Sequence, residues 1–115
     1  MTNIFPEPIL RLPEADIPLK GISAYLSQGE NHQVIFMYFG EDVDLPEHSH
    51  KSQWGVVFEG KLDLTIGGVK KTYLKGDHYF IPEGVRHSGH IYAGLNVMDY
   101  FDQKDRYGIK PGQRL

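Results

Sequence analysis

The chain of 115 residues contains no cysteine and no long apolar run. Without cysteine the protein has no disulfides, no thiolate metal ligands and no cysteine nucleophile. No stretch approaches the roughly 20 apolar residues that span a bilayer, and the first residues lack the basic start and apolar core of a signal peptide. We therefore expect a cytoplasmic protein with no membrane partner.

Clusters of basic residues are also absent. The net charge is −3 at pH 7, and the sequence pI is about 6.0. Proteins that bind nucleic acid concentrate positive charge on one face, so we expect no nucleic-acid partner. The length suits one hydrophobic core and not two, which predicts a single domain over residues 1–115.

Short stretches of alternating apolar and polar residues recur along the chain, and glycine or proline separates them. In the clearest case Leu62, Leu64 and Ile66 alternate with polar residues before Gly67-Gly68, a two-residue hairpin turn. No window of ten or more residues shows a helical period. Strands are predicted over residues 22–26, 33–39, 61–66, 69–74, 77–81, 88–92 and 95–101. The pattern indicates an all-β sandwich or barrel.

Three segments carry no such alternation. Residues 1–20 contain four prolines, which predict an extended, non-helical arm that covers the domain or adds an edge strand. Residues 40–46 are acidic and predict a loop. Residues 102–115 form a polar tail, which we expect on the surface or at a dimer contact.

Histidines and a glutamine have the spacing of a metal site. His48 and His50 alternate, so on an extended strand their imidazoles point the same way. His87 can supply a third nitrogen, because the glycines and proline before it predict a strand and a tight turn that could bring its side chain over His48 and His50. Gln53 offers an amide oxygen as a fourth ligand. The turn residues are Gly76, Pro82 and Gly84. Such a donor set suits Zn²⁺, Ni²⁺, Fe²⁺, Mn²⁺ or Cu²⁺ better than Ca²⁺.

These two segments resemble the two motifs of the cupin superfamily. The first motif is matched by His48, His50, Gln53 and Gly60, and the second by the segment from Gly76 to His87. The resemblance covers roughly residues 33 to 101. It implies a double-stranded β-helix, or jelly roll, with a metal inside its mouth, and a homodimer formed through sheet contacts.

Three positions depart from the cupin pattern. Gln53 stands where glutamate is usual and one residue early, Gly40 lies too far upstream of His48, and Ile91 replaces an asparagine that often ends the second motif. Some cupins do have glutamine at the ligand position, among them proteins that resemble the bacterial enzymes opening unsaturated uronate sugars. The ligand set therefore resembles that subgroup.

Strand alternation predicts which neighbours of Gln53 share its face. If Gln53 faces inward, so should Gly55 and Val57. Gly55 then leaves room for a substrate near the metal, or else marks a bulge in the sheet. Residues of the opposite parity, expected to pack on a second sheet or in a dimer interface, are Trp54, Val56 and Phe58.

Candidates for proton transfer lie on the strands near the motifs. Asp99 stands in an otherwise apolar strand, so its carboxylate faces either the pocket or a salt bridge on the outer surface. Tyr38 and Tyr100 are the other catalytic candidates that we select. The wider pool also holds Tyr79, Tyr92 and Arg86.

Three functions agree with this pattern. The first is a Lewis-acid metalloenzyme of the isomerase or lyase type that acts on a small anionic metabolite, similar to a sugar or a keto acid. A metal with uncharged ligands keeps its full +2 charge and favours an anionic oxygen. The second is a metal-containing module that binds or senses a small molecule without turnover, and the third is a metal-dependent dioxygenase.

Overall fold

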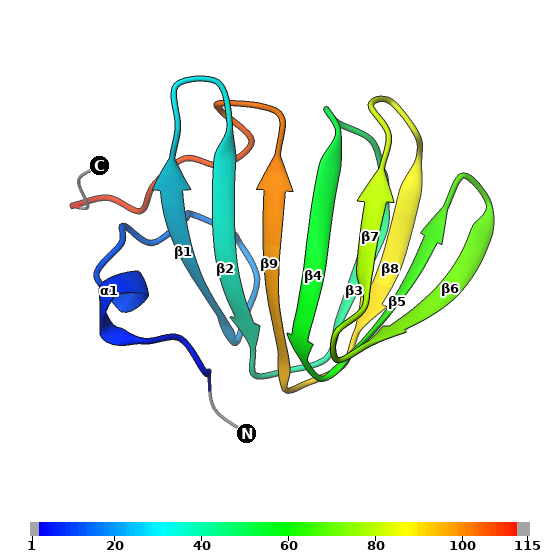
Figure 1. Ribbon diagram of the computed structural model, residues 1–115, viewed down its shortest axis with the longest axis horizontal. Coiled ribbons are helices and arrows are strands. Elements are labelled where there is room, and N and C mark those ends of the chain that lie inside the picture. Colours follow the sequence, from blue (N-terminus) through cyan, green and yellow to red (C-terminus); the bar gives the residue numbers. More distant parts are fainter. Residues whose placement is uncertain (1–2, 113–115) are drawn as a thin grey trace.

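The strands of the computed structural model, which describes residues 3–112, form two antiparallel sheets that face one another (Figure 1). The first sheet has the order β1-β2-β9-β4-β7, with β1 Ile22–Gln28, β2 Gln33–Phe39, β9 Leu95–Phe101, β4 Gln53–Glu59 and β7 His78–Ile81. The second has the order β3-β8-β5-β6, with β3 Val43–His48, β8 His87–Ile91, β5 Lys61–Ile66 and β6 Val69–Leu74. The architecture is the predicted all-β jelly roll.

Alternation located most of these strands correctly. The bounds of β2 and β9 are those predicted, and the two strands pair with Gln33 opposite Phe101 and Phe39 opposite Leu95. Gly67 and Gly68 both have positive φ, at 55° and 85°, which the tight turn between β5 and β6 requires. Apolar side chains of the inward parity from both sheets form the core.

Strand β3 begins at Val43, inside the segment 40–46 for which the sequence predicted an acidic loop, so that prediction was wrong for residues 43–46. Asp44 lies opposite His90 of β8, and its Oδ1 lies 2.6 Å from His90 Nδ1. Pro46 is tolerated because β3 is at the edge of its sheet and its register shifts just before His48. Pairing with β8 stabilises a strand that the local composition does not favour.

The N-terminal arm contains one helical turn, α1 Glu7–Leu10, so the prediction of a wholly non-helical arm was also wrong. Pro8 stands in the first turn, where its missing N–H needs no partner. Phe5 is buried and makes edge-to-face contacts with three rings of the first sheet, Tyr25, Phe36 and Phe58. The arm therefore covers part of the outer face of that sheet.

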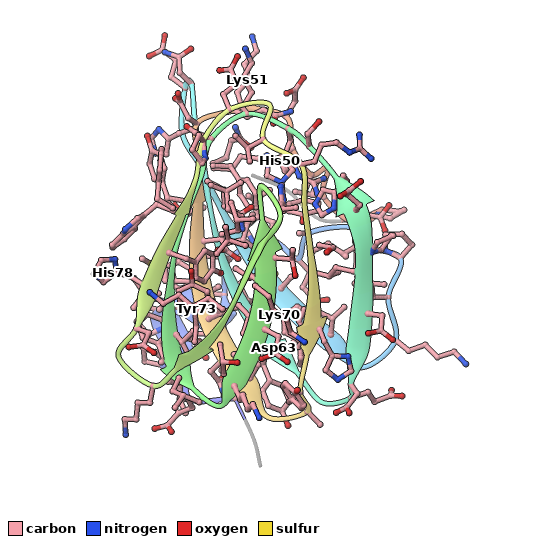
Figure 2. The ribbon with its side chains drawn as sticks, turned by 90° about the vertical axis from the view of Figure 1, so that its right-hand side faces the viewer. His50, Lys51, Asp63, Lys70, Tyr73 and His78 are labelled. Atoms are coloured by element: carbon pink, nitrogen blue, oxygen red, sulfur yellow. The ribbon has the colours of Figure 1, made fainter. Side chains whose placement is uncertain are left out.

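Figure 2 shows the two layers from the side. His50 lies at one end of the sandwich, whereas His78 projects outward from the first sheet. Within residues 3–112, no helix has the length and apolar character needed to cross a membrane.

Candidate metal centre and active site

Three imidazoles converge at one end of the sandwich. His48 ends β3, His50 lies in the loop that follows, and His87 begins β8. Their candidate ligand atoms all lie within 4.8 Å of one another, and His50 Nε2 lies 3.1 Å from His87 Nε2. The predicted grouping is therefore present, although His50 lies beyond the end of the strand. The Gly84 N–H donates to the His50 carbonyl oxygen at 2.9 Å, which joins the two sequence motifs directly.

Backbone carbonyls orient all three rings. The Nδ1 atoms of His48, His50 and His87 lie 2.8, 2.7 and 2.9 Å from carbonyl oxygens of Pro46, Lys51 and Val85, respectively. A carbonyl only accepts, so these partners place a proton on Nδ1, and in the neutral form of each ring the free lone pair is then on Nε2. Two lone pairs 3.1 Å apart repel unless a cation or proton lies between them.

The chemistry of this donor set fits a divalent transition metal. Bonds of about 2.0–2.1 Å from two imidazole nitrogens to one ion allow a separation of the kind seen between His50 and His87. Burial lowers the pKa of His50 to about 4 and also lowers the pKa of His87, so both rings are neutral at pH 7, as ligation requires. Carbonyl partners at Nδ1 are the usual support for metal-binding histidines.

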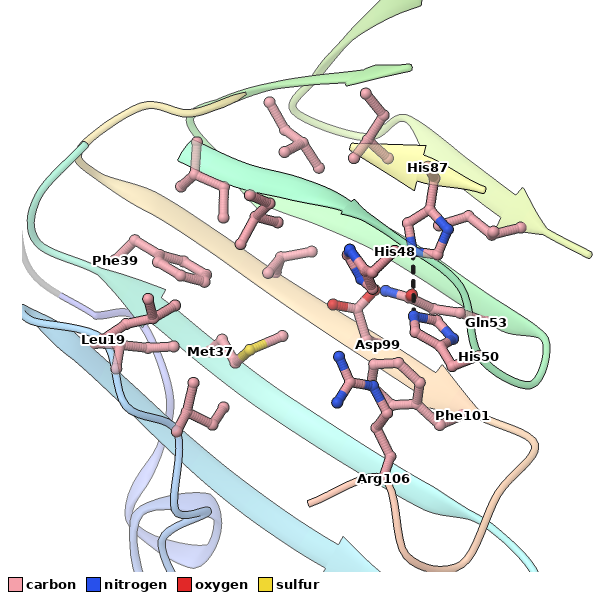
Figure 3. A pocket seen from close by; sticks show the side chains of 18 of the residues that line it. Leu19, Met37, Phe39, His48, His50, Gln53, His87, Asp99, Phe101 and Arg106 are labelled. Atoms are coloured by element: carbon pink, nitrogen blue, oxygen red, sulfur yellow. Dashed lines mark hydrogen bonds between the residues drawn. The ribbon is translucent and has the colours of Figure 1, made fainter. Parts of the chain in front are cut away.

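Gln53 begins β4 and lines the same cavity. Its side chain donates a hydrogen bond to Asp99, a bond that lowers the pKa of that carboxyl. The amide oxygen remains available on the side of the imidazoles, and Figure 3 shows the Gln53 amide between Asp99 and the histidines. One amide can therefore bind Asp99 through nitrogen and a metal through oxygen.

Asp99 faces the cavity and not the outer surface. Its side chain is buried, and Tyr79 Oη donates a hydrogen bond of 2.6 Å to Asp99 Oδ1. Burial raises the pKa of Asp99 to about 6, although hydrogen bonds from Tyr79 and Gln53 and the charge of Arg106 oppose the shift. Burial also raises the pKa of Tyr79 well above its usual value, so the phenol stays protonated as the donor.

Gly55 has a different role from either one predicted for it. A Cβ at this position would overlap both the Tyr79 ring and the Asp99 carboxylate. The missing side chain therefore makes room for the Tyr79–Asp99 hydrogen bond and not for a substrate. The register shift in β4 lies after Val57, so Gly55 is not a bulge either.

The polar tail is exposed at Asp102, Lys104 and Asp105, in line with the expectation of a surface segment, but two of its residues depart from that expectation and line the cavity. Arg106 and Tyr107 both line the cavity wall, and the guanidinium lies over the rings of Phe101 and Tyr107, at 5.7 and 4.4 Å from their centroids. Arg106 Nε is buried and has no hydrogen-bond partner among the described residues. The polar composition of the tail gave no sign of this; the only signal was an arginine next to an aromatic residue.

Tyr38 and Tyr100 are not among the residues that line this cavity. Met37 and Phe39 line it from β2, so Tyr38 between them has the outward parity. Tyr100 is 38% exposed and stacks on His32 on the outer face of the first sheet. The structure therefore brings Asp99, but neither of these tyrosines, to the histidine cluster.

The cavity between the sheets has a volume of about 320 Å³. Its histidine end carries the polar side chains, as Figure 3 shows, and the opposite end is lined by apolar ones such as Leu19, Met37 and Phe39. A concave, mostly apolar pocket with a few convergent polar groups is typical of a small-molecule site.

A family model described as the cupin domain matches residues 34–94, more than half of the chain. The protein therefore belongs to the cupin family, as the two histidine motifs predicted. Over 64 residues the chain is 33% identical to quercetin 2,3-dioxygenase of Bacillus subtilis (strain 168). That match covers 54% of this chain and 19% of the relative, so the chain spans about a fifth of the length of that enzyme.

Solved structures share the fold. An RmlC-like cupin from Shewanella frigidimarina NCIMB 400 has a TM-score of 0.70 and 24% identity, over 82% of this chain and 86% of that one. KdgF from Halomonas sp. has a TM-score of 0.67 and 18% identity, over 80% and 88%. Oxalate decarboxylase from Bacillus subtilis has a TM-score of 0.67 and 22% identity, over 80% of this chain and 27% of that one. These identities establish a common fold and no common activity.

Proposed function

We propose that the protein is a metal-dependent cupin enzyme of the isomerase or lyase type, which acts on a small anionic metabolite similar to a sugar or a keto acid. The observation that carries this proposal is the convergence of three kinds of group on one cavity: a cluster of imidazoles, a buried carboxylate, and an arginine whose Nε is buried and without a partner among the described residues. The imidazoles suit a metal that acts as a Lewis acid, the carboxylate suits proton transfer, and the guanidinium suits the recognition of an anion.

His48, His50 and His87 hold the metal through Nε2, and Gln53 adds its amide oxygen. The metal is Zn²⁺, Ni²⁺, Fe²⁺, Mn²⁺ or Cu²⁺, because nitrogen and amide donors suit these ions. When bound, such an ion polarises a substrate carbonyl as a Lewis acid. The likeness of the fold to KdgF is consistent with the resemblance of the ligand set to the uronate ring-opening subgroup.

Asp99 moves the proton. Among the described residues that line the cavity it is the one carboxylate, and the Tyr79 and Gln53 hydrogen bonds fix its orientation. Arg106 binds the carboxylate of the substrate. Its planar fork matches a carboxylate, and its buried Nε has no protein partner to give up.

A first experiment measures the metal content of protein purified without a chelating column, for the unmodified chain, His50→Ala and Gln53→Ala. We expect near-stoichiometric metal in the unmodified protein, strong loss in His50→Ala and partial loss in Gln53→Ala. An unmodified protein that binds no metal even after reconstitution would contradict the enzyme proposal and leave a small-molecule binding or sensing module as the function.

A second experiment follows proton exchange. Metal-loaded protein is incubated in D₂O with unsaturated uronates and 2-oxo acids, and deuterium incorporation and product formation are read by NMR. Asp99→Asn should abolish exchange and retain ligand binding. Equal exchange by Asp99→Asn and the unmodified protein would show that Asp99 is not the base.

The match to quercetin 2,3-dioxygenase favours a metal-dependent dioxygenase as a second candidate. Oxygen consumption by the Fe²⁺- and Cu²⁺-loaded protein, measured with the same acids and with flavonols, separates this candidate from the first. Consumption that depends on substrate and is lost in His50→Ala would favour the dioxygenase.

The outer face of the first sheet forms a homodimer interface in this proposal. Trp54, Phe80 and Tyr100 are 38%, 56% and 38% exposed and lie side by side on β4, β7 and β9. Phe58, which the sequence placed either against a second sheet or in a dimer interface, lies against Phe5 of the N-terminal arm instead. Exposed apolar patches of this kind mark interaction sites.

A further inference from the structure

The cavity that contains the histidines is polar at one end only. At its inner end, Leu95 and Val97 of β9 lie opposite Phe39 and Met37 of β2, and all four line the cavity. Leu62 of the second sheet faces them from across the sandwich and also lines it. Figure 3 shows Phe39, Leu19 and Met37 on the side of the cavity away from the histidines.

Both sheets show the same change from polar to apolar along their strands. On β9 the inward positions run from Asp99 to Leu95, and on β8 they run from His87 to Ile91. Each interval is four residues, which corresponds to about 13 Å of strand. The cavity is therefore amphipathic along its length, with one wall contributed by each sheet.

A volume of about 320 Å³ is too large for an incidental packing defect in a domain of this size. Protein interiors contain few voids larger than a water molecule, and the stability lost to a cavity increases with its volume. An engineered apolar cavity of about 150 Å³ stays dry and accepts benzene. The volume here thus leaves room for a ring-sized apolar body beside a polar head.

We propose that the inner end of this cavity binds the apolar body of an amphipathic carboxylic acid, a 2-oxo acid with an aliphatic or aromatic side chain. The position of the head rests on the proposed function, since the carboxylate contacts Arg106 at the histidine end. The body extends past Val97 toward Leu95 and Phe39. A polyhydroxylated sugar fits this end poorly, because its hydroxyl groups would lose water without gaining partners among these side chains.

The test is a chain-length series on the unmodified protein. Straight-chain 2-oxo acids from 2-oxobutanoate to 2-oxodecanoate are titrated by calorimetry into metal-loaded and metal-free protein. Burial of one methylene strengthens binding by about fourfold, so the affinity should rise with each carbon until the inner end is full. An affinity that does not change with length, or tighter binding of a uronate than of every 2-oxo acid in the series, would overturn the proposal.

A pair of variants locates the binding region. Val97→Phe fills the middle of the cavity and should lower the affinity for the longest acids at least tenfold while that for 2-oxobutanoate changes less than threefold. Val56→Phe makes the same substitution on the outward parity of β4 and should change neither. Equal losses in both variants, or none in Val97→Phe, would overturn the proposal. Should Val97→Phe not fold, the series on the unmodified protein decides alone.

Matched acids without the 2-oxo group separate this inference from the proposed function. Straight-chain carboxylic acids should show the same dependence on length with metal-free protein, even if no substrate is turned over. If affinity rises with chain length but the protein neither binds metal nor turns over a substrate, the apolar binding site at the inner end is supported and the proposed enzyme function is contradicted. If short acids are turned over but affinity does not depend on length, the enzyme function is supported and the apolar binding site is contradicted.

Discussion

Tyr79 Oη donates a hydrogen bond of 2.6 Å to Asp99 Oδ1, and both side chains are buried between the sheets beside the histidine cluster. The two residues come from β7 and β9, which flank β4 in the first sheet. Gly55 of β4 lies between them, and its missing side chain leaves the space in which the hydrogen bond forms. Three adjacent strands therefore fix the orientation of one carboxylate.

Gly55→Ala should destabilise the protein by about 1–3 kcal/mol, the usual cost of overpacking a core. The added Cβ would overlap the Tyr79 ring and the Asp99 carboxylate, so one of them must move. Urea unfolding measures the loss. Gly108→Ala is the control, because a Cβ there meets no atom within 4 Å and the backbone needs no positive φ. Equal stability of Gly55→Ala and Gly108→Ala would contradict the role assigned to Gly55.

The buried Asp99 carboxyl should make stability depend on pH. Its pKa is raised from 3.8 to about 6 in the folded protein, so the protonated form favours folding. Its contribution, on the order of 3 kcal/mol, is fully present below about pH 4 and is lost as pH rises through 6. The lowered pKa of His50 acts in the opposite direction, with stability lost as pH falls from about 6.5 toward 4.

Comparison with Asp99→Asn separates the two groups, because His50 is common to both proteins. Between pH 4 and 7 the unfolding free energy of the metal-free unmodified protein should fall relative to that of Asp99→Asn. Urea unfolding at several pH values measures this difference. If the two curves are parallel, Asp99 does not titrate in this range.

The sequence predicts the strands that owe their position to their own alternation, and it misses those that depend on a partner. β2 and β9 alternate clearly and were located to the residue. β3 carries acidic residues and a proline, and it becomes a strand through its pairing with β8. The histidine cluster could be predicted from residue spacing, because its members belong to two short motifs, one with His48 and His50 and one that ends at His87.

The rest of the site depends on contacts between residues far apart in the chain. Arg106 enters the cavity because its guanidinium lies against Phe101 and Tyr107, and nothing in a polar tail predicts that packing. Tyr79 was one of several tyrosines near the motifs, and only its position beside Gly55 singles it out. The outward direction of Trp54 was predicted correctly, because alternation along a single strand is enough to tell which face a side chain lies on.

The exposed aromatic residues of the first sheet should mediate self-association. We expect a dimer in sedimentation experiments on the unmodified protein and a monomer for Trp54→Ser combined with Phe80→Ser. A stable interface needs about 800 Å² from each partner, and the two substitutions remove large aromatic side chains from that area. Val69→Ser is the control, since Val69 is 69% exposed on the other sheet. A monomer at every concentration of the unmodified protein would contradict the interface.

Arg106→Lys should weaken the binding of 2-oxo acids about tenfold, because lysine keeps the charge but lacks the planar fork that pairs with a carboxylate. Calorimetry on the metal-loaded protein measures the change. Arg86→Lys is the matched control: Arg86 is exposed and pairs with Glu47 outside the cavity, at 2.8 Å. Equal affinities in the unmodified protein and in Arg106→Lys would show that the guanidinium does not contact the ligand.

Gln53→Glu tests why an uncharged amide stands beside Asp99. Without metal, the new carboxylate loses the hydrogen bond to Asp99 and places a second acid next to a buried one, so we expect a destabilisation of about 1–3 kcal/mol. With metal, a charged ligand binds more tightly and should offset this loss, so the rise in Tm on adding Zn²⁺ should exceed that of the unmodified protein. Gln33→Glu is the control, because Gln33 is a buried glutamine outside the cavity, hydrogen-bonded to Gln28 and to the Tyr107 carbonyl. Gln33→Glu should lower the stability by the same amount with and without Zn²⁺. If the rise in Tm on adding Zn²⁺ is the same for Gln53→Glu as for the unmodified protein, Gln53 is not a metal ligand.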